Sequence, residues 1–194
     1  MPAQVPTILL TDIFGINEHL LSFIDDSGLA GHVDIVDPYN GQQFAFESQQ
    51  QAYDAFITHG GLDRYTETLR QTLLNKQCPH QLLGFSAGGS AVWRVLDESA
   101  DVIKNVNSAM CFYPGQIRHF ITLQPKVDVT LIFPALESHF DVKPVIKQLK
   151  EKSKVLCIET DYEHGFMNAQ LPAFEAQGYK GFVTSLKHKK GRIE

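Results

Sequence analysis

Short apolar runs alternate with longer amphipathic segments along most of the chain. The apolar runs are nearly continuous, which is typical of strands buried on both faces of a parallel sheet. They lie at 6–11, 32–37, 79–85, 109–113, 127–133 and 154–159. Several of the segments between them carry their apolar residues on one side of a helix. The predicted helices lie at 17–27, 48–58, 63–76, 87–96 and 142–150. The alternation predicts an α/β fold, with a mostly parallel sheet covered by helices on both faces.

The composition fits one globular domain. The chain has 194 residues, of which 43% are hydrophobic and 20% are charged. Both values are ordinary for a soluble protein, and the length is ordinary for one domain. No repeat, low-complexity segment or linker divides the chain, so we expect a single domain over 1–194. The segment 116–126 is too short for a large lid.

The distribution of charge argues against some partners. The net charge of −5 gives no electrostatic reason to expect binding to nucleic acid. Basic residues gather at 187–192, where a solvated chain end is favoured over a phosphate-binding tail. No apolar run approaches the length of a membrane span, so we expect no membrane association.

The cysteines indicate a reducing environment. Cys111 and Cys157 lie inside apolar runs, where cysteine behaves as a small hydrophobic residue. Together with Cys78 they show no metal-binding spacing, so we expect no metal. Residues 1–5 are not followed by the long apolar stretch of a secretion signal. We therefore expect a cytoplasmic protein.

Segment 84–88 reads Gly-Phe-Ser-Ala-Gly and carries the strongest chemical signal. A predicted strand precedes it and a predicted helix follows it. A sharp turn from strand to helix leaves no room for a Cβ two residues before or after its apex, and it presents the apex hydroxyl. Ser86 is that apex and the candidate nucleophile of a serine hydrolase with the α/β-hydrolase fold. By itself the motif also fits a glycine-rich turn that caps a helix.

A serine nucleophile needs a base, and the base needs an acid that orients it. His164 follows the last predicted strand and is the candidate base. Two acids follow the strand at 127–133. Glu137 lies nearer to the strand end and is the favoured acid. Asp141 is the alternative, although it is also placed to cap the helix that follows.

Other predicted site residues follow the carboxyl ends of the strands, where parallel sheets bind their ligands. The backbone N–H groups of Ala87 and Ile13 are candidates for an oxyanion hole. The side chains of Asp12, Phe14 and Tyr113 are candidates for contacts with substrate.

Three segments together resemble the dienelactone hydrolase family of the α/β hydrolases. Residues 11–17, Thr-Asp-Ile-Phe-Gly-Ile-Asn, resemble the family's N-terminal Glu-Ile-Phe-Gly-Val-Asn stretch. Residues 84–89 resemble its nucleophile elbow, and 164–168, His-Gly-Phe-Met-Asn, resemble its histidine loop. The resemblance implies Ser86 as nucleophile, His164 as base and Glu137 as acid. It also implies the N–H groups of Ala87 and Ile13 as the oxyanion hole.

The chain departs from the family pattern at four of these positions. Ser86 stands where the best-known members have a nucleophilic cysteine, and Asp12 stands where they have a glutamate. Asn168 lies near the position of an arginine that holds the substrate carboxylate in the family. Glu137 replaces the usual aspartate. The resemblance therefore transfers the scaffold and the triad, but not dienelactone as the substrate.

These observations predict a serine hydrolase of a small ester or thioester that needs no cofactor. Peptide hydrolysis and cleavage of a carrier-bound thioester on the same scaffold are related possibilities. The alternative from another class is a catalytically silent α/β-hydrolase fold that acts as a binding or interaction module. The sequence leaves the oligomeric state open.

Overall fold

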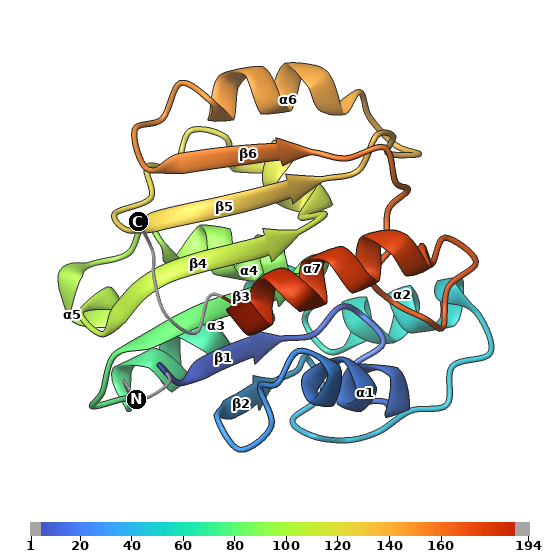
Figure 1. Cartoon of the computed structure of the whole chain (residues 1–194). Coiled ribbons are helices and arrows are strands. Elements are labelled where there is room, and N and C mark those ends of the chain that lie inside the picture. The colour runs from blue at the N-terminus through green and yellow to red at the C-terminus, as the bar shows by residue number, and fades with distance from the viewer. Residues whose placement is uncertain (1–4, 189–194) are drawn as a thin grey trace.

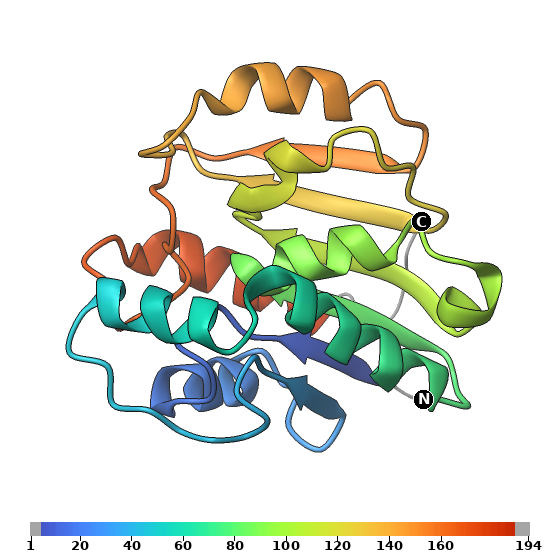
Figure 2. The same cartoon turned by 180° about the vertical axis from the view of Figure 1, so that it is seen from behind.

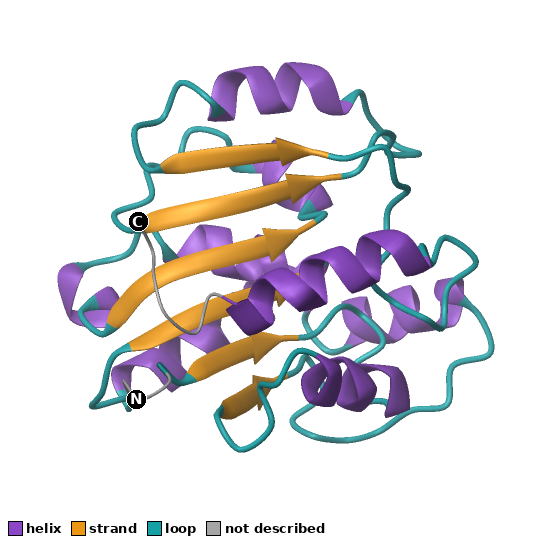
Figure 3. Cartoon of the chain, in the orientation of Figure 1, coloured by secondary structure: helices purple, strands orange, loops and turns teal. Residues whose placement is uncertain are grey.

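A six-stranded sheet forms the centre of the molecule (Figures 1 and 3). The computed structural model describes residues 5–188. The strands are β1 (Thr7–Leu10), β2 (Val33–Val36), β3 (His80–Phe85), β4 (Val106–Phe112), β5 (Asp128–Phe133) and β6 (Val155–Glu159). Their order is β2-β1-β3-β4-β5-β6, and every neighbouring pair is parallel. The predicted parallel sheet is confirmed.

Helices cover both faces of the sheet (Figures 1 and 2). They are α1 (Glu18–Asp26), α2 (Gln49–Thr58), α3 (Gly61–Leu74), α4 (Ala87–Val95), α5 (Ala100–Ile103), the 3-10 helix η1 (Gly115–His119), α6 (Val142–Leu149) and α7 (Ala176–His188). Phe23 of α1 and Val183 of α7 belong to one apolar core. The other helices contribute to a second core on the opposite face. The two cores explain why the strand sequences are apolar on both sides.

The order of the strands determines where a site can form. From β1 the chain moves to β2 on one side, and it then returns to place β3 on the other side of β1. The connections after β1 and β3 therefore leave the sheet in opposite directions, which opens a crevice at the carboxyl ends of these strands. The loop at 11–17 and the turn at Ser86 lie at this switch point.

Three observed elements were not predicted from the sequence. Helices α5 and η1 are short, so they give little periodic signal. Helix α7 is longer, and its apolar residues Tyr179, Phe182, Val183 and Leu186 pack on the α1 side of the sheet. Their spacing of three and four residues is the signal that could have revealed it. Lys187 lies at the end of α7, whereas the other basic residues at 189–192 fall outside the described part of the chain.

The observed boundary of α3 differs from the predicted one because of two glycines. The helix begins at Gly61 rather than at 63, and Gly60 caps it with a φ of 93°. Such a φ suits glycine, which has no Cβ to clash with the preceding carbonyl. Between residues 5 and 188, the chain has no helix long and apolar enough to cross a membrane.

Candidate active site

Ser86 occupies a strained turn between β3 and α4. Its φ is 50° and its ψ is −112°, a combination that costs a non-glycine residue about 1–3 kcal/mol. The Ser86 N–H donates to the carbonyl of Phe112 in β4, 2.9 Å away, and this bond holds the turn against the sheet. The strain is maintained by the surrounding sheet and places the hydroxyl beyond the strand end.

The glycines of the turn allow it to pack closely. A Cβ on Gly84 would lie 2.7 Å from the Cα of Gly89, inside the turn itself. A Cβ on Gly88 would meet the carbonyl oxygens of Leu10 and Thr11 at the end of β1, the former at 2.7 Å. Gly88 thus lets α4 begin directly beside β1, and this brings the loop after β1 next to Ser86.

His164 lies within hydrogen-bonding reach of the serine. The distance between His164 Nε2 and Ser86 Oγ is 3.0 Å. The histidine follows β6 in a tight turn, and Gly165 continues this turn with a φ of 90°. The imidazole is therefore placed to accept the serine proton, because its second nitrogen has a partner of its own.

That partner is Glu137. Its Oε1 lies 2.8 Å from His164 Nδ1, and the side chain is only 8% exposed. The loops that carry the two residues run side by side, since Leu136 forms a bridge with Glu163 and the Ala135 N–H donates to the carbonyl of Tyr162. A carboxylate in this position favours the Nδ1–H tautomer and stabilises the imidazolium.

Asp141 has a different place in the structure. It precedes α6 and its Oδ1 accepts a hydrogen bond from the Lys143 N–H, 3.0 Å away. This is the geometry of a helix N-cap. Of the two acids that the sequence offered, Glu137 is the one that the structure brings to the histidine.

The two backbone N–H groups predicted for the oxyanion hole are both free in the described chain. The Ala87 N–H is at the first position of α4, and the Ile13 N–H is in the loop after β1. Neither has a hydrogen-bond partner within residues 5–188. The neighbouring N–H groups of Phe14 and Gly15 both donate back to Asp12. This local turn leaves the Ile13 N–H available, as an oxyanion hole requires.

Asp12 is held by hydrogen bonds from two sides. Its Oδ1 accepts from the Phe14 N–H at 2.9 Å, and its Oδ2 accepts from Asn168 Nδ2 at 2.8 Å. Burial of the carboxyl raises the pKa of Asp12 above its ordinary value of 3.8. The two hydrogen bonds and the nearby His164 lower this pKa to a smaller extent. Asp12 is thus a half-buried acid close to the candidate base.

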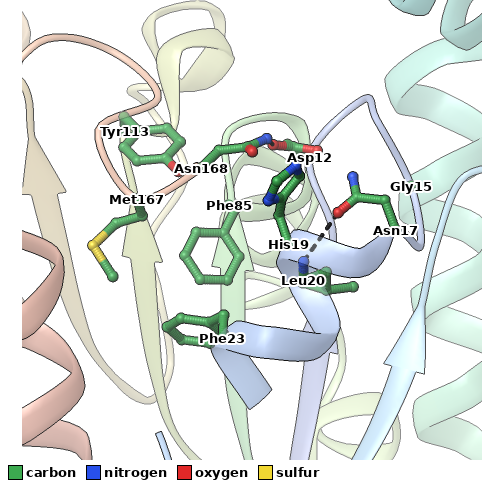
Figure 4. Close-up of a pocket in the computed structure, with 10 residues that line it drawn as sticks. All are labelled: Asp12, Gly15, Asn17, His19, Leu20, Phe23, Phe85, Tyr113, Met167 and Asn168. Carbon is green, nitrogen blue, oxygen red and sulfur yellow. Dashed lines mark hydrogen bonds between the residues drawn. The ribbon is translucent and has the colours of Figure 1, made fainter. Parts of the chain in front are cut away.

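A pocket opens beside these residues on the α1 side of the sheet, shown in Figure 4. It is lined by Asp12, Gly15, Asn17, His19, Leu20, Phe23, Phe85, Tyr113, Met167 and Asn168. It holds about 340 Å³ of empty space, counting the part that opens to solvent. The triad residues are not among those that line this pocket, but the lining residue Tyr113 contacts the ring of His164.

Tyr113 forms part of the pocket wall and has a left-handed backbone conformation. Its φ is 39°, its ring centroid lies 4.9 Å from that of His164, and its buried hydroxyl has no hydrogen-bond partner in the described chain. The Met167 N–H lies near the hydroxyl but outside hydrogen-bonding geometry. Burial, together with the charge of Asp12, raises the pKa of Tyr113, so the phenol stays protonated at neutral pH.

The three side chains predicted to contact substrate do not all line the pocket. Asp12 and Tyr113 line the pocket, whereas the buried ring of Phe14 does not line it and packs against Phe46. Asn168 and Phe23 also line the pocket and were not predicted as contacts. Asn168 is the last residue of the histidine loop, and this position is the signal that could have indicated it. Phe23 lies on the apolar side of α1 and could be placed near Ser86 only by the fold.

The parallel sheet, the strained serine at its switch point and the histidine after its last strand define an α/β-hydrolase fold. Solved structures share it. A candidate dienelactone hydrolase from Klebsiella pneumoniae is 10% identical, with a TM-score of 0.71 over 98% of this chain and 89% of that one. The dienelactone hydrolase from Anabaena variabilis is 11% identical, with a TM-score of 0.64 over 96% and 86%.

Further comparisons agree with this fold. The dienelactone hydrolase-like promiscuous phosphotriesterase P91 from metagenomic libraries is 13% identical, with a TM-score of 0.64 over 96% of this chain and 85% of that one. The fold is thus that of dienelactone hydrolase-like proteins. No protein-family model matches the chain. In sequence, the uncharacterized protein YczH of Bacillus subtilis (strain 168) is 28% identical over 168 residues, which is 83% of this chain and 80% of the relative.

Proposed function

We propose that the protein is a serine hydrolase that cleaves a small ester or thioester through an acyl-enzyme on Ser86. The contact between His164 and Ser86, at 3.0 Å, is the observation that carries this proposal. The 2.8 Å contact between His164 and Glu137 supports it. The dienelactone hydrolase-like fold of the solved neighbours is consistent with hydrolysis.

In the first half of the reaction, Ser86 Oγ attacks the carbonyl carbon and its proton passes to His164 Nε2. The negative charge that develops on the carbonyl oxygen is received by the N–H groups of Ala87 and Ile13. The position of Ala87 at the start of α4 adds the favourable end of the helix dipole. Collapse of the tetrahedral intermediate expels the leaving group, which takes the proton from His164 and leaves an acyl-serine.

In the second half, His164 removes a proton from water, and the resulting hydroxide attacks the acyl carbon. The second tetrahedral intermediate collapses, Ser86 regains its proton from His164, and the carboxylic acid leaves. Glu137 stabilises the imidazolium in both halves. These steps need a nucleophile, a base and two N–H donors, all of which the chain supplies, so the proposal includes no cofactor.

A fluorophosphonate probe tests the proposal. It should label the protein covalently, and Ser86→Ala and His164→Ala should each abolish labelling. Ser185→Ala in α7 and the exposed His32→Ala serve as matched controls and should label normally. Persistent labelling of Ser86→Ala would remove Ser86 from the role of nucleophile. Hydrolysis rates of 4-nitrophenyl acetate and of a matched thioester compare ester with thioester cleavage at the same acyl group.

The same experiment addresses the alternative of a silent binding module. A folded protein that neither reacts with the probe nor hydrolyses simple esters would favour that alternative. The strained backbone of Ser86 argues for catalysis, because strain of this kind concentrates at functional sites.

The cytoplasmic location stays a prediction. Cys78, Cys111 and Cys157 are all free thiols in the structure.

A further inference from the structure

The pocket beside the triad is placed to receive one substituent of the scissile bond. Phe85, which lines it, directly precedes Ser86. Tyr113, on another wall, has its ring 4.9 Å from the ring of His164. A substrate whose carbonyl carbon meets Ser86 Oγ therefore has this pocket next to it. Either the acyl chain or the leaving group would extend into it.

One side of the pocket is apolar. Phe23 of α1, Phe85 of β3 and Met167 of the histidine loop are 3%, 5% and 4% exposed. Leu20 of α1 completes this side, and Figure 4 shows these side chains together. Such walls favour a hydrocarbon chain or ring, because its transfer from water is favourable. They offer a charged group nothing to replace its hydration.

The charged residues that line the pocket disfavour an anionic substituent. Among the residues that line it there is no lysine and no arginine, and Asp12 is the acid. The two N–H donors that hold Asp12 are neutral, so neither of them offsets its negative charge. His19 is the one basic side chain in the lining, and its Nε2 lies 3.7 Å from the carboxylate of Glu18. A second carboxylate in this space would face Asp12 at short range.

Arg118 does not change this balance. Its guanidinium lies 4.7 Å from the centre of the Phe140 ring, in the loop of Glu137, and it donates to the Gly115 carbonyl. It is not among the residues that line the pocket. The cation is thus associated with the loop of the triad acid rather than with the pocket.

We infer that the pocket selects an uncharged apolar or aromatic substituent and rejects a substituent that ends in a carboxylate. This inference rests on the proposed function and names the substrate class of the same site. The repulsion comes from Asp12, and the attraction comes from the walls formed by Phe23, Phe85 and Met167.

Two matched pairs of esters test the inference, one for each direction in which a substrate could lie. The first pair compares 4-nitrophenyl pentanoate with mono-4-nitrophenyl glutarate, which differ by a carboxylate at the end of an acyl chain of the same carbon number. The second pair compares phenyl acetate with 4-carboxyphenyl acetate. In at least one pair kcat/KM, corrected for intrinsic reactivity, should favour the neutral ester by about ten-fold or more, as repulsion at an effective dielectric constant of about 20 requires.

Variants identify the source of the selectivity. Asp12→Asn keeps an acceptor for the Phe14 N–H and removes the charge, so the neutral-to-anionic ratio should fall toward one. Asp101→Asn, at an exposed position in α5, is the matched control and should leave the ratio unchanged. If Asp12→Asn does not fold, Leu20→Arg provides the second measurement, because a cation in the wall should reverse the preference.

The outcomes distinguish the two proposals. A ratio near one in both pairs, or a preference for the anionic esters, would overturn the inference while Ser86-dependent turnover left the proposed function intact. A ratio that Asp12→Asn and Leu20→Arg both leave unchanged would also overturn it. Absence of both probe labelling and ester turnover in the folded wild-type protein would overturn the proposed function, and the inference would fall with it.

Discussion

Asn168 donates a hydrogen bond of 2.8 Å from its side-chain amide to the carboxyl of Asp12. The two residues lie in loops at opposite ends of the chain, after β1 and after β6. The bond therefore connects the segment that holds the Ile13 N–H with the segment that holds His164. It also places a neutral donor, instead of a cation, beside a half-buried acid. The stability and the selectivity of the site should both depend on this acid.

The stability of the protein should depend on pH through Asp12. Its pKa in the folded protein is raised above the ordinary value of 3.8, so the folded state binds the proton more tightly than the unfolded state does. The resulting contribution to stability is fully present below pH 3.8 and is lost as the pH rises through the raised pKa. Asp12→Asn removes the charge and should therefore be more stable than the wild type at pH 7.

Urea unfolding of both proteins between pH 3.5 and 7.5 measures this effect. The difference in free energy of unfolding should shrink toward the acid end of the series. Asp101→Asn, on the exposed surface of α5, serves as control and should show no such convergence. A difference that is constant with pH would show that the effect of Asp12→Asn is not electrostatic.

The strain at Ser86 predicts that glycine is tolerated better than alanine at this position, which is the reverse of their order within a helix. Glycine relieves the unfavourable φ of 50°, whereas alanine retains the Cβ that causes the strain. We expect Ser86→Gly to be more stable than Ser86→Ala by about 1 kcal/mol, after the greater unfolded-state entropy of glycine is counted against it. Both should lose covalent labelling.

The same two substitutions at Ser185 provide the comparison. This residue lies within α7, where alanine should be the more stable by about 1 kcal/mol. Chemical denaturation of the four variants gives the two differences. The same sign at both positions would contradict the role of backbone strain at Ser86.

Substitutions at the two candidate acids should affect different properties, which are the activity at Glu137 and the stability at Asp141. Glu137→Gln retains the shape of the side chain but removes the charge that stabilises the imidazolium of His164, and kcat should fall by about 10⁴-fold. Asp141→Asn keeps a good helix cap and should retain activity and stability. Asp141→Ala removes the cap of α6 and should cost about 1 kcal/mol of stability without loss of kcat. Steady-state kinetics and urea unfolding on the same preparations test both statements. Loss of activity in Asp141→Asn with full activity in Glu137→Gln would reverse the assignment.

The hydroxyl of Tyr113 should contribute little to stability. It is buried without a hydrogen-bond partner in the described chain, so Tyr113→Phe removes an unsatisfied group and should be neutral or stabilising. Tyr65 is the matched control. Its buried hydroxyl lies 2.8 Å from the carbonyl of Val36 and 3.1 Å from that of Thr11. Tyr65→Phe should cost about 1–2 kcal/mol. An equal loss in both variants, measured by thermal or urea unfolding, would indicate that the Tyr113 hydroxyl is satisfied in solution.

Much of the fold could be predicted from the sequence because the strands of a parallel sheet are buried on both faces. Near-continuous apolar runs therefore located all six observed strands to within a few residues. Helix α7 was missed although its apolar residues repeat with helical spacing. The short elements α5 and η1 carry too few residues to show a period. The order of the strands, which opens the crevice between β1 and β3, is not contained in any local pattern.

The sequence by itself determined the residue types that can perform the chemistry and the elements that carry them. Glycines at 84 and 88 permit a tight turn around Ser86, where a Cβ at either position would collide with neighbouring backbone. Only the tertiary structure decided that Glu137 meets His164, because parallel loops after β5 and β6 run side by side. It also decided that Asp12 and Asn168 share a pocket with Phe23. These contacts join residues far apart in the chain, and the packing of the sheet and helices determines which of them meet.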